Sequence, residues 1–452
     1  MDLLTLVKNI NSLFWGFLLL ILLCGTGIFF TFKLKFIQVR KFKESFKKTF
    51  GGLTLKGAKA DKDGMSSFQS LATAIAAQVG TGNLAGAATA IASGGPGAIF
   101  WMWLSAFFGM STIFAEASLA QKYKTTVNGE VTGGPAYYIQ AAFKGKFGKF
   151  LSKLFAILII FALGFMGNMV QANSIGDAFN NAFNINPIIP GIIVAILAAF
   201  IFFGGISKIA SVTEKIVPLM ALFYILGSLL IVILNISSLG EAFKSIFVGA
   251  FSPEAATGGL LGVTIKQAVR YGVARGLFSN EAGMGSTPHA HAIAKVKHPC
   301  DQGIVSLMGV FIDTFIILTL TALVILTTGA LDGNTTGISL TQNAFNLGLG
   351  TFGNYFIAIC LFFFAFSTIV GWYFFGELNI KFLFGKKATK IYALIVLCFI
   401  VLGSTLKVDL VWELADMFNG FMVIPNLIAL LALNGVVSNL LKEYENKENL
   451  KS

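Results

Sequence analysis

Charged residues are scarce in this sequence. Lysine, arginine, aspartate and glutamate together make up only 12% of its 452 residues, about half of the roughly 25% that is usual for a soluble globular chain. So few charges cannot cover a water-facing exterior, which excludes a soluble enzyme and an intrinsically disordered chain. Cysteine is also scarce, with four residues and no CxxC spacing. This excludes a disulfide scaffold and a cysteine-based metal site.

Hydrophobic residues dominate the chain instead. They make up 56% of it, with 46 phenylalanines, and the mean hydropathy is +0.79. A chain of this length has room for about ten membrane-spanning helices of about 20 residues each. The net charge of +12 does not indicate a nucleic-acid partner, because lysine and arginine are spread among the gaps between apolar runs. The sequence therefore predicts an all-α polytopic membrane protein.

Eleven apolar stretches are separated by polar or basic gaps. We expect membrane-spanning helices at 13–32, 66–93, 97–121, 151–174, 188–206, 216–235, 262–290, 302–328, 353–376, 391–405 and 410–433. The first should be a retained helix rather than a cleaved signal, because a strongly basic connector follows it.

Basic connectors alternate with gaps that have almost no lysine or arginine, such as 180–187 and 329–353. The positive-inside rule then places the protein in the cell membrane with its N-terminus outside and its C-terminus in the cytoplasm. We expect the basic segment 33–62 to lie along the anionic inner leaflet.

Two blocks of five spans have nearly equal length. An odd number of spans in each block gives the second block the opposite membrane orientation, an arrangement found in secondary transporters. The predicted organisation is an extra N-terminal helix with the basic segment (1–65), a first repeat (66–235), an extracellular connector (236–261), an inverted second repeat (262–433) and a polar cytoplasmic tail (434–452).

The first helix of each block contains glycines at a similar depth. Gly80 and Gly276 each lie 14 residues after the start of their span, within the runs 80–86 and 276–285. An unwound segment frees main-chain N–H and C=O groups that lipid cannot satisfy, so it persists only if those groups meet a polar ligand, water or protein. Paired interruptions of this kind predict a transporter's binding site, although glycines also allow close helix packing, which we favour for Gly86.

Three long motifs resemble the sodium:alanine (glycine) symporter family: QVGTGNLAG at 78–86, GGPGAIFWMW at 94–103 and FSNEAGMGS at 278–286. The resemblance implies the amino-acid–polyamine–cation superfamily architecture, a leucine-transporter-type 5+5 inverted repeat with one additional helix. It also implies cotransport of Na⁺, as the coupling ion, with a small neutral amino acid such as alanine or glycine, without an organic cofactor or enzymatic activity.

A zwitterionic amino acid needs hydrogen-bond donors at one end and acceptors at the other. We expect the N–H groups of Thr81, Gly82 and Asn83, with the Thr81 hydroxyl, to hold the carboxylate. Carbonyls of Gly276 to Phe278 and the hydroxyl of Ser279 should accept hydrogen bonds from the ammonium group.

Other polar residues in apolar spans are expected to line the same site. Gln78 lies in the first interruption, and Asn168 and Gln171 are three residues apart and share one helix face. Phe278 and Trp372 leave little spare volume, which favours a small substrate side chain.

Ser367 and Thr368 form an adjacent pair of hydroxyl residues in a phenylalanine-rich span. The resemblance implies that such a pair binds Na⁺ together with the carbonyls of Ala76, Val79 and Phe364. The alternative is that both hydroxyls merely bond to the preceding turn of their own helix.

Several alternatives remain at this point. Asn280 is as well explained by helix capping as by binding, and Arg270 and Arg275 should pair with carboxylates that the sequence does not identify. Proton coupling through Lys215 would replace sodium. An ion channel would need a continuous pore, and an enzyme would need a catalytic motif that the sequence lacks.

Overall fold

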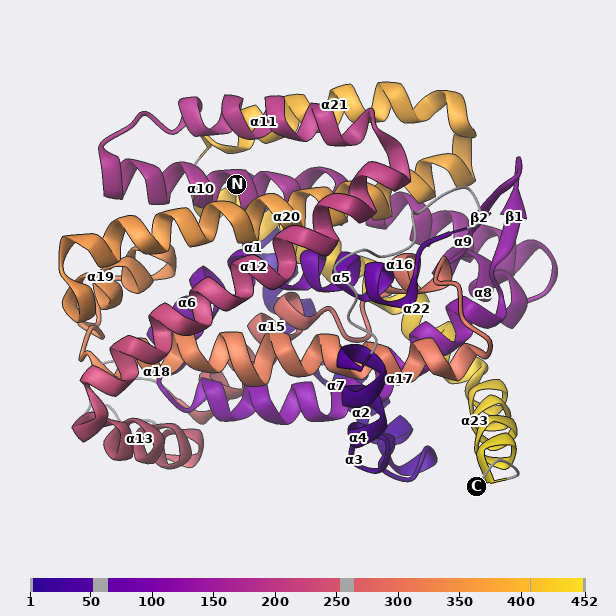
Figure 1. Ribbon diagram of the computed structural model, residues 1–452, viewed down its shortest axis with the longest axis horizontal. Helices are drawn as coiled ribbons and strands as arrows, with labels where there is room; N and C mark the ends of the chain where they lie inside the picture. Colours follow the sequence, from indigo (N-terminus) through magenta and orange to yellow (C-terminus); the bar gives the residue numbers. More distant parts are fainter. Residues whose placement is uncertain (1–2, 52–63, 253–263, 407, 450–452) are drawn as a thin grey trace.

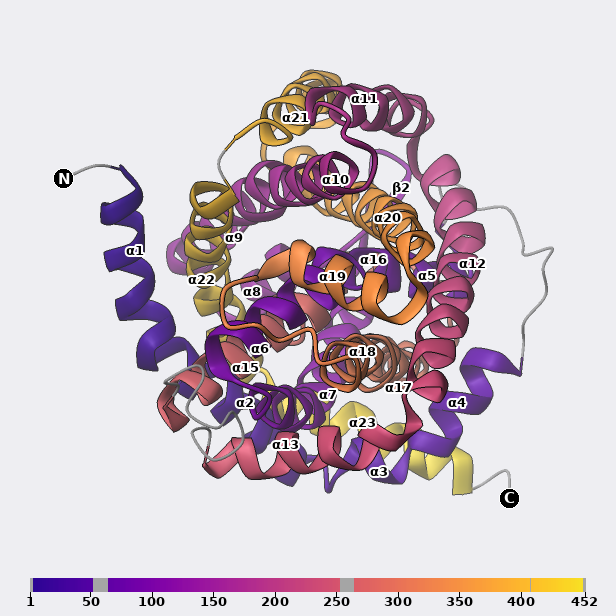
Figure 2. The same cartoon turned by 90° about the vertical axis from the view of Figure 1, so that its left-hand side faces the viewer.

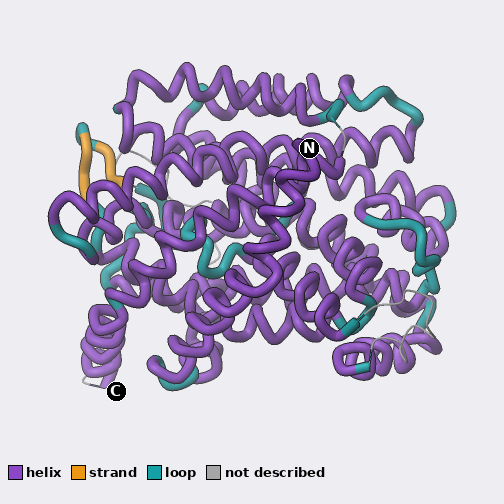
Figure 3. The backbone as a smooth tube through the Cα atoms, turned by 180° about the vertical axis from the view of Figure 1, so that it is seen from behind, coloured by secondary structure: helices purple, strands orange, loops and turns teal. Residues whose placement is uncertain are grey.

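The computed structural model describes residues 3–51, 64–252, 264–406 and 408–449, and almost all of them are helical (Figure 3). The first part of the chain forms α1 (Leu3–Leu13), η1 (Phe14–Leu18), α2 (Leu19–Lys33), α3 (Ile37–Arg40), α4 (Phe42–Phe50), α5 (Ser67–Gln78), η2 (Gly82–Gly86), α6 (Ala87–Gly94), α7 (Ala98–Lys122), the antiparallel hairpin β1 (Thr125–Val127) and β2 (Glu130–Thr132), α8 (Pro135–Ala142), α9 (Gly145–Ile159), η3 (Ile160–Gly167), α10 (Asn168–Phe183), α11 (Ile188–Phe202), α12 (Gly205–Leu234), η4 (Ile236–Ser238) and α13 (Leu239–Phe251).

The remaining elements are α15 (Ile265–Asn280), α16 (Pro288–Ala292), α17 (Pro299–Val310), η5 (Phe311–Leu318), α18 (Thr319–Thr327), α19 (Gly337–Leu349), α20 (Thr351–Phe384), η6 (Lys386–Ala388), α21 (Thr389–Gly403), α22 (Val408–Ala432) and α23 (Asn434–Asn449). Segments η1, η2, η3 and η5 are π-helical, with a wider turn than the α-helix. Such segments are rare and occur frequently at functional sites.

Six helical stretches in the described part of the chain are long and apolar enough to cross a membrane. They are Ala98–Lys122, Gly145–Phe183, Gly205–Leu234, Pro299–Thr327, Thr351–Phe384 and Asp409–Ala432. Two shorter apolar helices are Leu19–Lys33 and Ile188–Phe202. The eleven predicted stretches fall mainly on helical residues, but 66–93 and 262–290 are interrupted helices rather than continuous ones. The protein is therefore a multi-pass membrane protein.

The long helices run side by side along the longest axis of the molecule, with α13 and α19 at one end and the β1–β2 hairpin, α8 and α23 at the other (Figure 1). Seen along that axis, α6 and α16 lie inside a ring that includes α7, α10, α12, α17, α20 and α22 (Figure 2). Residues 69–91 of the first interrupted helix are buried almost without exception. In the second interrupted helix residues 276–287 are buried, whereas residues 264–267 at its start are exposed. Both interruptions thus lie in the interior.

The C-terminal segment differs from the predicted polar tail. Residues 434–449 form α23, which packs against α7 and α17. Val437, Leu440, Leu441 and Tyr444 are all buried, and their spacing places them on one helix face. Parts of three predicted regions, 52–63, 253–261 and 450–452, lie outside the described residues.

Candidate functional site

The first interruption lies where the glycines predicted it. Helix α5 begins with a capping box, in which Ser66 and Gln69 exchange hydrogen bonds of 3.1 Å, and it ends at Gln78. Val79 is extended, with φ −84° and ψ 94°, and the chain becomes helical again at η2. The N–H of Gly80 donates to Asn83 Oδ1 at 2.9 Å, and that of Thr81 to Gln171 Oε1 at 3.1 Å. Side chains therefore replace part of the lost helix ladder.

The second interruption begins later than predicted, which corrects the position expected at Gly276. Helix α15 winds past Gly276 and Phe278 to Asn280, and residues 281–287 are non-helical. Glu281 ends the helix in the left-handed conformation, with φ 58°. A Cβ on Gly276 would lie 3.3 Å from Met102 and Ser105, so this glycine serves close packing against α7. Because Gly276 lies inside the helix, its carbonyl accepts the hydrogen bond of the helix itself and is not free to bind a ligand.

Two buried carboxylates stabilise the second interruption. Glu116 of α7 accepts hydrogen bonds from the N–H groups of Gly283 at 3.0 Å and Gly285 at 2.9 Å. Glu281 accepts from the Ser286 hydroxyl at 2.5 Å and from the Trp372 indole. These bonds satisfy main-chain and side-chain donors that would otherwise be unpaired in the low-dielectric interior.

The two interruptions are in direct contact. A Cβ on Gly82 would lie 3.0 Å from both Cα and Cβ of Ser279, so only glycine lets η2 approach the end of α15 this closely. Gln78 Nε2 also donates to the Asn280 carbonyl at 2.6 Å. The structure therefore brings the predicted residues Gln78, Gly82 and Ser279 together from chain segments about 200 residues apart.

Asp313, a carboxylate within the predicted span 302–328, joins both interruptions. This fully buried side chain lies on η5 and accepts hydrogen bonds from Asn83 Nδ2 at 2.6 Å, Ser279 Oγ at 2.9 Å and Thr314 Oγ1 at 2.8 Å. Asn280 Nδ2 donates to Thr314 at 3.2 Å. Asn280 therefore contributes to this polar network beyond its place at the helix end.

Four buried polar atoms around the first interruption have no partner among the described residues. Two of them, the Thr81 hydroxyl and Gln171 Nε2, belong to residues that contact each other in space. The other two are Gln78 Oε1 and Asn168 Oδ1. Asn168 Nδ2 donates to Gly164 of its own helix at 3.0 Å. Buried polar groups are normally hydrogen-bonded, so this cluster of unpaired donors and acceptors fits a polar ligand.

The predicted cation ligands also converge. Thr368 Oγ1 lies 2.9 Å from the Ala76 carbonyl, 3.3 Å from that of Val79 and 3.1 Å from that of Phe364. Ser367 Oγ lies 2.8 Å from the Phe364 carbonyl and 3.5 Å from that of Ala76. These five oxygen atoms are ligands of the kind that a hard cation prefers; Met220 Sδ also lies nearby, 3.4 Å from Ser367 Oγ. The carbonyls of Ala76 and Val79 lie at the end of α5, where the interruption removes the next helical turn and its N–H donors.

Aromatic side chains form one wall of this centre. Phe278 and Trp372 meet edge to face with ring centroids 5.9 Å apart. A Cβ on Gly167 would lie 2.6 Å from the Trp372 ring, so η3 packs directly on the indole. Both aromatic residues are buried. They therefore leave little room beside them for a large ligand.

Arg275 pairs with a carboxylate that the sequence did not identify, Asp416 of α22, through two hydrogen bonds of 2.9 and 2.8 Å. The guanidinium also lies 5.0 Å from the centroid of the Trp412 ring, which in turn contacts Phe278. Lys215, the residue considered for proton coupling, is exposed on α12. An exposed lysine does not line the buried site, so the position of Lys215 does not support proton coupling.

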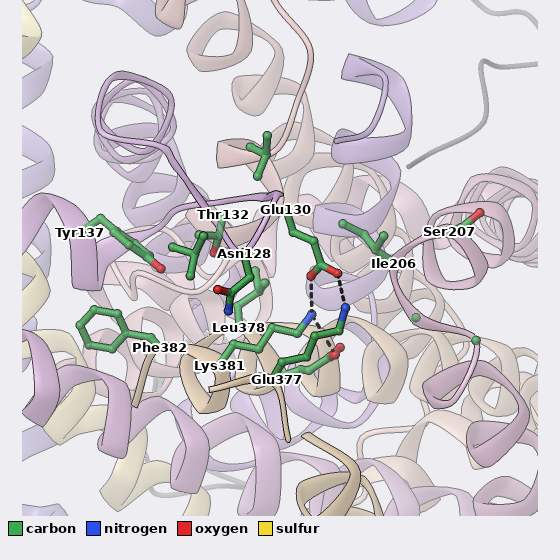
Figure 4. Close-up of a pocket in the computed structure, with 15 residues that line it drawn as sticks. Asn128, Glu130, Thr132, Tyr137, Ile206, Ser207, Glu377, Leu378, Lys381 and Phe382 are labelled. Atoms are coloured by element: carbon green, nitrogen blue, oxygen red, sulfur yellow. Dashed lines mark hydrogen bonds and ion pairs between the residues drawn. The ribbon is translucent and has the colours of Figure 1, made fainter. Parts of the chain in front are cut away.

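A second cluster of charges lies near the β1–β2 hairpin, beside a cavity of about 570 Å³. The Glu130 carboxylate points toward Lys381 and Lys386, and Lys381 also reaches Glu377 (Figure 4). The hydrogen bond from Lys386 at 2.6 Å, with the charge of Lys381, holds the pKa of Glu130 below its usual value. These pairs join the hairpin to the end of α20.

We expect Glu130→Gln to loosen the hairpin. Because the pKa of Glu130 is lowered in the folded protein, its ion pairs persist at neutral pH and are lost as the pH falls through that lowered value. Relative to the intrinsic exchange rate at each pH, hydrogen exchange at residues 125–132 should be faster in the variant at neutral pH, and acidification should raise this relative rate only in the unmodified protein. Lys387→Ala, at an exposed lysine beside the cluster, should leave both rates unchanged; equal rates in Glu130→Gln would contradict this role.

Comparisons with known proteins agree with the geometry. A sequence model described as the sodium:alanine symporter family matches residues 1–452. The sodium/alanine symporter AgcS of Methanococcus maripaludis is 45% identical over 450 residues, covering 98% of each chain. The probable sodium/glutamine symporter GlnT of Bacillus subtilis is 44% identical over 437 residues, covering 96% of this chain and 89% of the relative.

Solved structures with a similar fold include MhsT. MhsT in complex with L-phenylalanine superposes with a TM-score of 0.58 at 14% sequence identity, covering 85% of this chain and 98% of that one. At this identity the likeness concerns the fold alone.

Proposed function

The chain belongs to the sodium:alanine symporter family, and on that premise we propose that it couples the inward flow of Na⁺ to uptake of a small neutral amino acid, alanine or glycine. The observation that carries this proposal is the contact between two interrupted helices, with unpaired polar atoms beside it. A zwitterion has the charges to satisfy such atoms at both of its ends.

The substrate carboxylate would lie at the start of η2. The first N–H groups of a helix have no partner within that helix, and the partial positive charge at this end favours an anion. The Thr81 hydroxyl and Gln171 Nε2 are unpaired donors beside it. The Ser279 hydroxyl and the carboxylate of Asp313 lie on the opposite side, 2.9 Å apart, and would attract the ammonium group.

The cation would lie among Ala76, Val79, Phe364, Ser367 and Thr368. When an ion binds there, its charge attracts the carbonyl oxygens that now accept from the two hydroxyls. Binding would fix the end of α5 against α20, and Thr81 follows this end by only three residues. Ion binding would in this way organise the substrate site, which is a coupling free energy between the two ligands.

Phe278 and Trp372 would limit the substrate side chain. Each additional methylene in such a pocket changes discrimination by about 1–3 kcal/mol, so selectivity should be graded. The Arg275–Asp416 pair would close the site on one side, because it joins α15 to α22 beside Phe278.

We further propose eleven membrane-spanning helices in a 5+5 inverted repeat with one additional helix, and alternating access between the two sides. Both α5 and α15 begin with a capping box of the same kind, Ser66 with Gln69 and Thr264 with Gln267, as expected for two related repeats. The distribution of basic residues supports an outer N-terminus and a cytoplasmic C-terminus.

Uptake of radiolabelled alanine into proteoliposomes tests this proposal. An inward Na⁺ gradient should drive accumulation, whereas equal Na⁺ on both sides or replacement of Na⁺ by K⁺ should allow only equilibration or little uptake. Accumulation driven by a proton gradient in the absence of Na⁺ would favour the proton-coupled alternative. Absence of amino-acid uptake under every gradient would contradict the proposal.

A further inference from the structure

A cavity of about 360 Å³ lies on the outer side of η5, away from the substrate site. Val39 and Phe42 of the α3–α4 elbow, Phe107 of α7, and Phe311 and Phe315 of η5 are among its apolar lining residues. Phe42 and Phe311 pack edge to face at 4.8 Å, and Phe311 and Phe315 lie one turn apart. Such a lining suits a hydrocarbon chain.

One buried polar side chain, Gln38, also lines the cavity. Only 2% of its surface is exposed. Its Nε2 donates to Thr31 Oγ1 at 3.0 Å and to the Phe107 carbonyl at 3.2 Å, but its Oε1 has no partner among the described residues. A buried acceptor of this kind calls for a hydrogen-bond donor, which a hydrocarbon chain alone cannot provide.

Helix α4 carries exposed lysines directly after Phe42. Lys43 and Lys47 are exposed and one turn apart, and the described structure gives neither of them an ion pair. By contrast, Lys48 is paired with Asp301 at 2.6 Å. Phe46 and Phe50 are exposed beside them, at 54% and 38%. A helix face with phenylalanine and unpaired lysine is typical of one that lies at a membrane surface.

We propose that this cavity is a specific site for phosphatidylglycerol. The phosphate would lie near Lys43 and Lys47, a glycerol hydroxyl of the head group would donate to Gln38 Oε1, and an acyl chain would lie along Phe42, Phe311 and Phe315. Phosphatidylglycerol combines the negative charge, the hydroxyl donor and the hydrocarbon chain that these three features require, whereas phosphatidylcholine has no hydrogen-bond donor in its head group.

The site has a direct route to the transport centre. Phe311 and Phe315 of η5 line the cavity, whereas Asp313 of the same segment accepts hydrogen bonds from Asn83 and Ser279 of the interrupted helices. A π-helical segment has an extra residue in its turn and depends on its packing. Filling the cavity would therefore hold η5 in the form that presents Asp313, and transport should be faster when the lipid is bound.

Native mass spectrometry of the purified full-length chain tests binding. Phosphatidylglycerol should be retained in preference to phosphatidylcholine with the same acyl chains. The double variant Lys43→Ala/Lys47→Ala should bind it about thirtyfold more weakly at low salt, since each lysine near an anionic head group contributes about fivefold. Val39→Trp, at an exposed position on the cavity, should fill the cavity and abolish retention.

Matched variants separate the site from general effects of charge and size. Lys146→Ala/Lys149→Ala removes two exposed lysines on α9, and Ile391→Trp enlarges an exposed residue of α21; neither should alter retention. Lys43→Arg/Lys47→Arg should retain the lipid, which shows that the alanine variant has lost charge rather than fold. Equal retention of both lipids, or undiminished retention by the alanine variant, would overturn the proposal.

Uptake in vesicles tests the link to transport. The unmodified protein should transport faster in an equal mixture of phosphatidylcholine and phosphatidylglycerol than in phosphatidylcholine alone, whereas the alanine variant should show the slower rate in both. An equal rate for the unmodified protein in the two membranes would overturn the proposed effect on η5. Because retention is measured without transport, failure of the proposed transport function would leave the binding result interpretable.

Discussion

Replacing Thr368 by alanine is expected to remove most of the sodium dependence of transport. Its hydroxyl is within 3.3 Å of the Ala76, Val79 and Phe364 carbonyls and is the group that joins α20 to the end of α5. An interaction with a charged group contributes about 1.5–3 kcal/mol, so the apparent affinity for Na⁺ should fall about 10-fold to 100-fold. The measurement is the Na⁺ concentration dependence of alanine uptake in proteoliposomes.

Two controls decide between cation binding and ordinary helix chemistry at Thr368. Thr368→Ser retains the hydroxyl and should retain most of the affinity. Thr327→Ala removes a hydroxyl that bonds only to the Leu323 carbonyl of its own helix, at 2.7 Å, and should leave sodium dependence unchanged. If Thr368→Ala behaves like Thr327→Ala, the oxygen cluster does not bind the coupling ion.

Replacing Gly80 by alanine should strongly reduce transport through a steric clash at the centre of the site. A Cβ there would lie 2.3 Å from Thr368 Oγ1 and 3.0 Å from Gln171 Oε1, so it would displace side chains from both the proposed cation site and the proposed carboxylate site. Gly80 has no left-handed φ, and the effect is therefore one of space. Overpacking of a buried site costs about 1–3 kcal/mol, and if this cost falls on the transport-competent state, uptake should fall by about 5-fold to 150-fold.

Gly86→Ala is the matched control, six residues after Gly80 at the end of η2. The nearest atom to its new Cβ would be the Thr81 carbonyl oxygen at 3.8 Å, an ordinary contact, and alanine has the higher helix propensity. The Gly86 variant should fold and transport normally. Uptake by Gly80→Ala at the rate of Gly86→Ala would show that the first interruption does not require glycine for close approach.

The first interruption could be predicted from the sequence because its glycines and its polar residues are adjacent. The sequence places the second interruption too early, at Gly276, because a glycine in a span does not by itself show whether the helix unwinds there. The structure uses that glycine for close packing against α7, and the turn itself begins at Glu281, a residue type that rarely adopts φ 58°. Gly283 and Gly285, with φ 84° and 78°, are the glycines that this turn requires.

The role of Asp313 could not be predicted, because its partner Asn83 lies 230 residues away. A buried carboxylate in a span indicates a function, but only the three-dimensional fold shows that Asp313 connects both interruptions. The helix α23, by contrast, could have been predicted. Val437, Leu440, Leu441 and Tyr444 are three or four residues apart, as on one helix face, but the many charges between them favoured a solvated tail.

The arrangement of Ser367 and Thr368 against the carbonyls of Ala76, Val79 and Phe364 follows the implication of the family resemblance. No feature of the sequence alone placed these atoms within 3.5 Å of one another. Their convergence rests on the crossing of α5 and α20, which is a property of the fold.

An experimental structure determined with alanine and Na⁺ would test the central claim most directly. The account predicts density for the amino acid between Thr81 and Ser279, with its carboxylate at the first residues of η2 and its ammonium group toward Asp313. A well-ordered alanine bound elsewhere, with the atoms around Thr81 and Gln171 left unpaired, would contradict it.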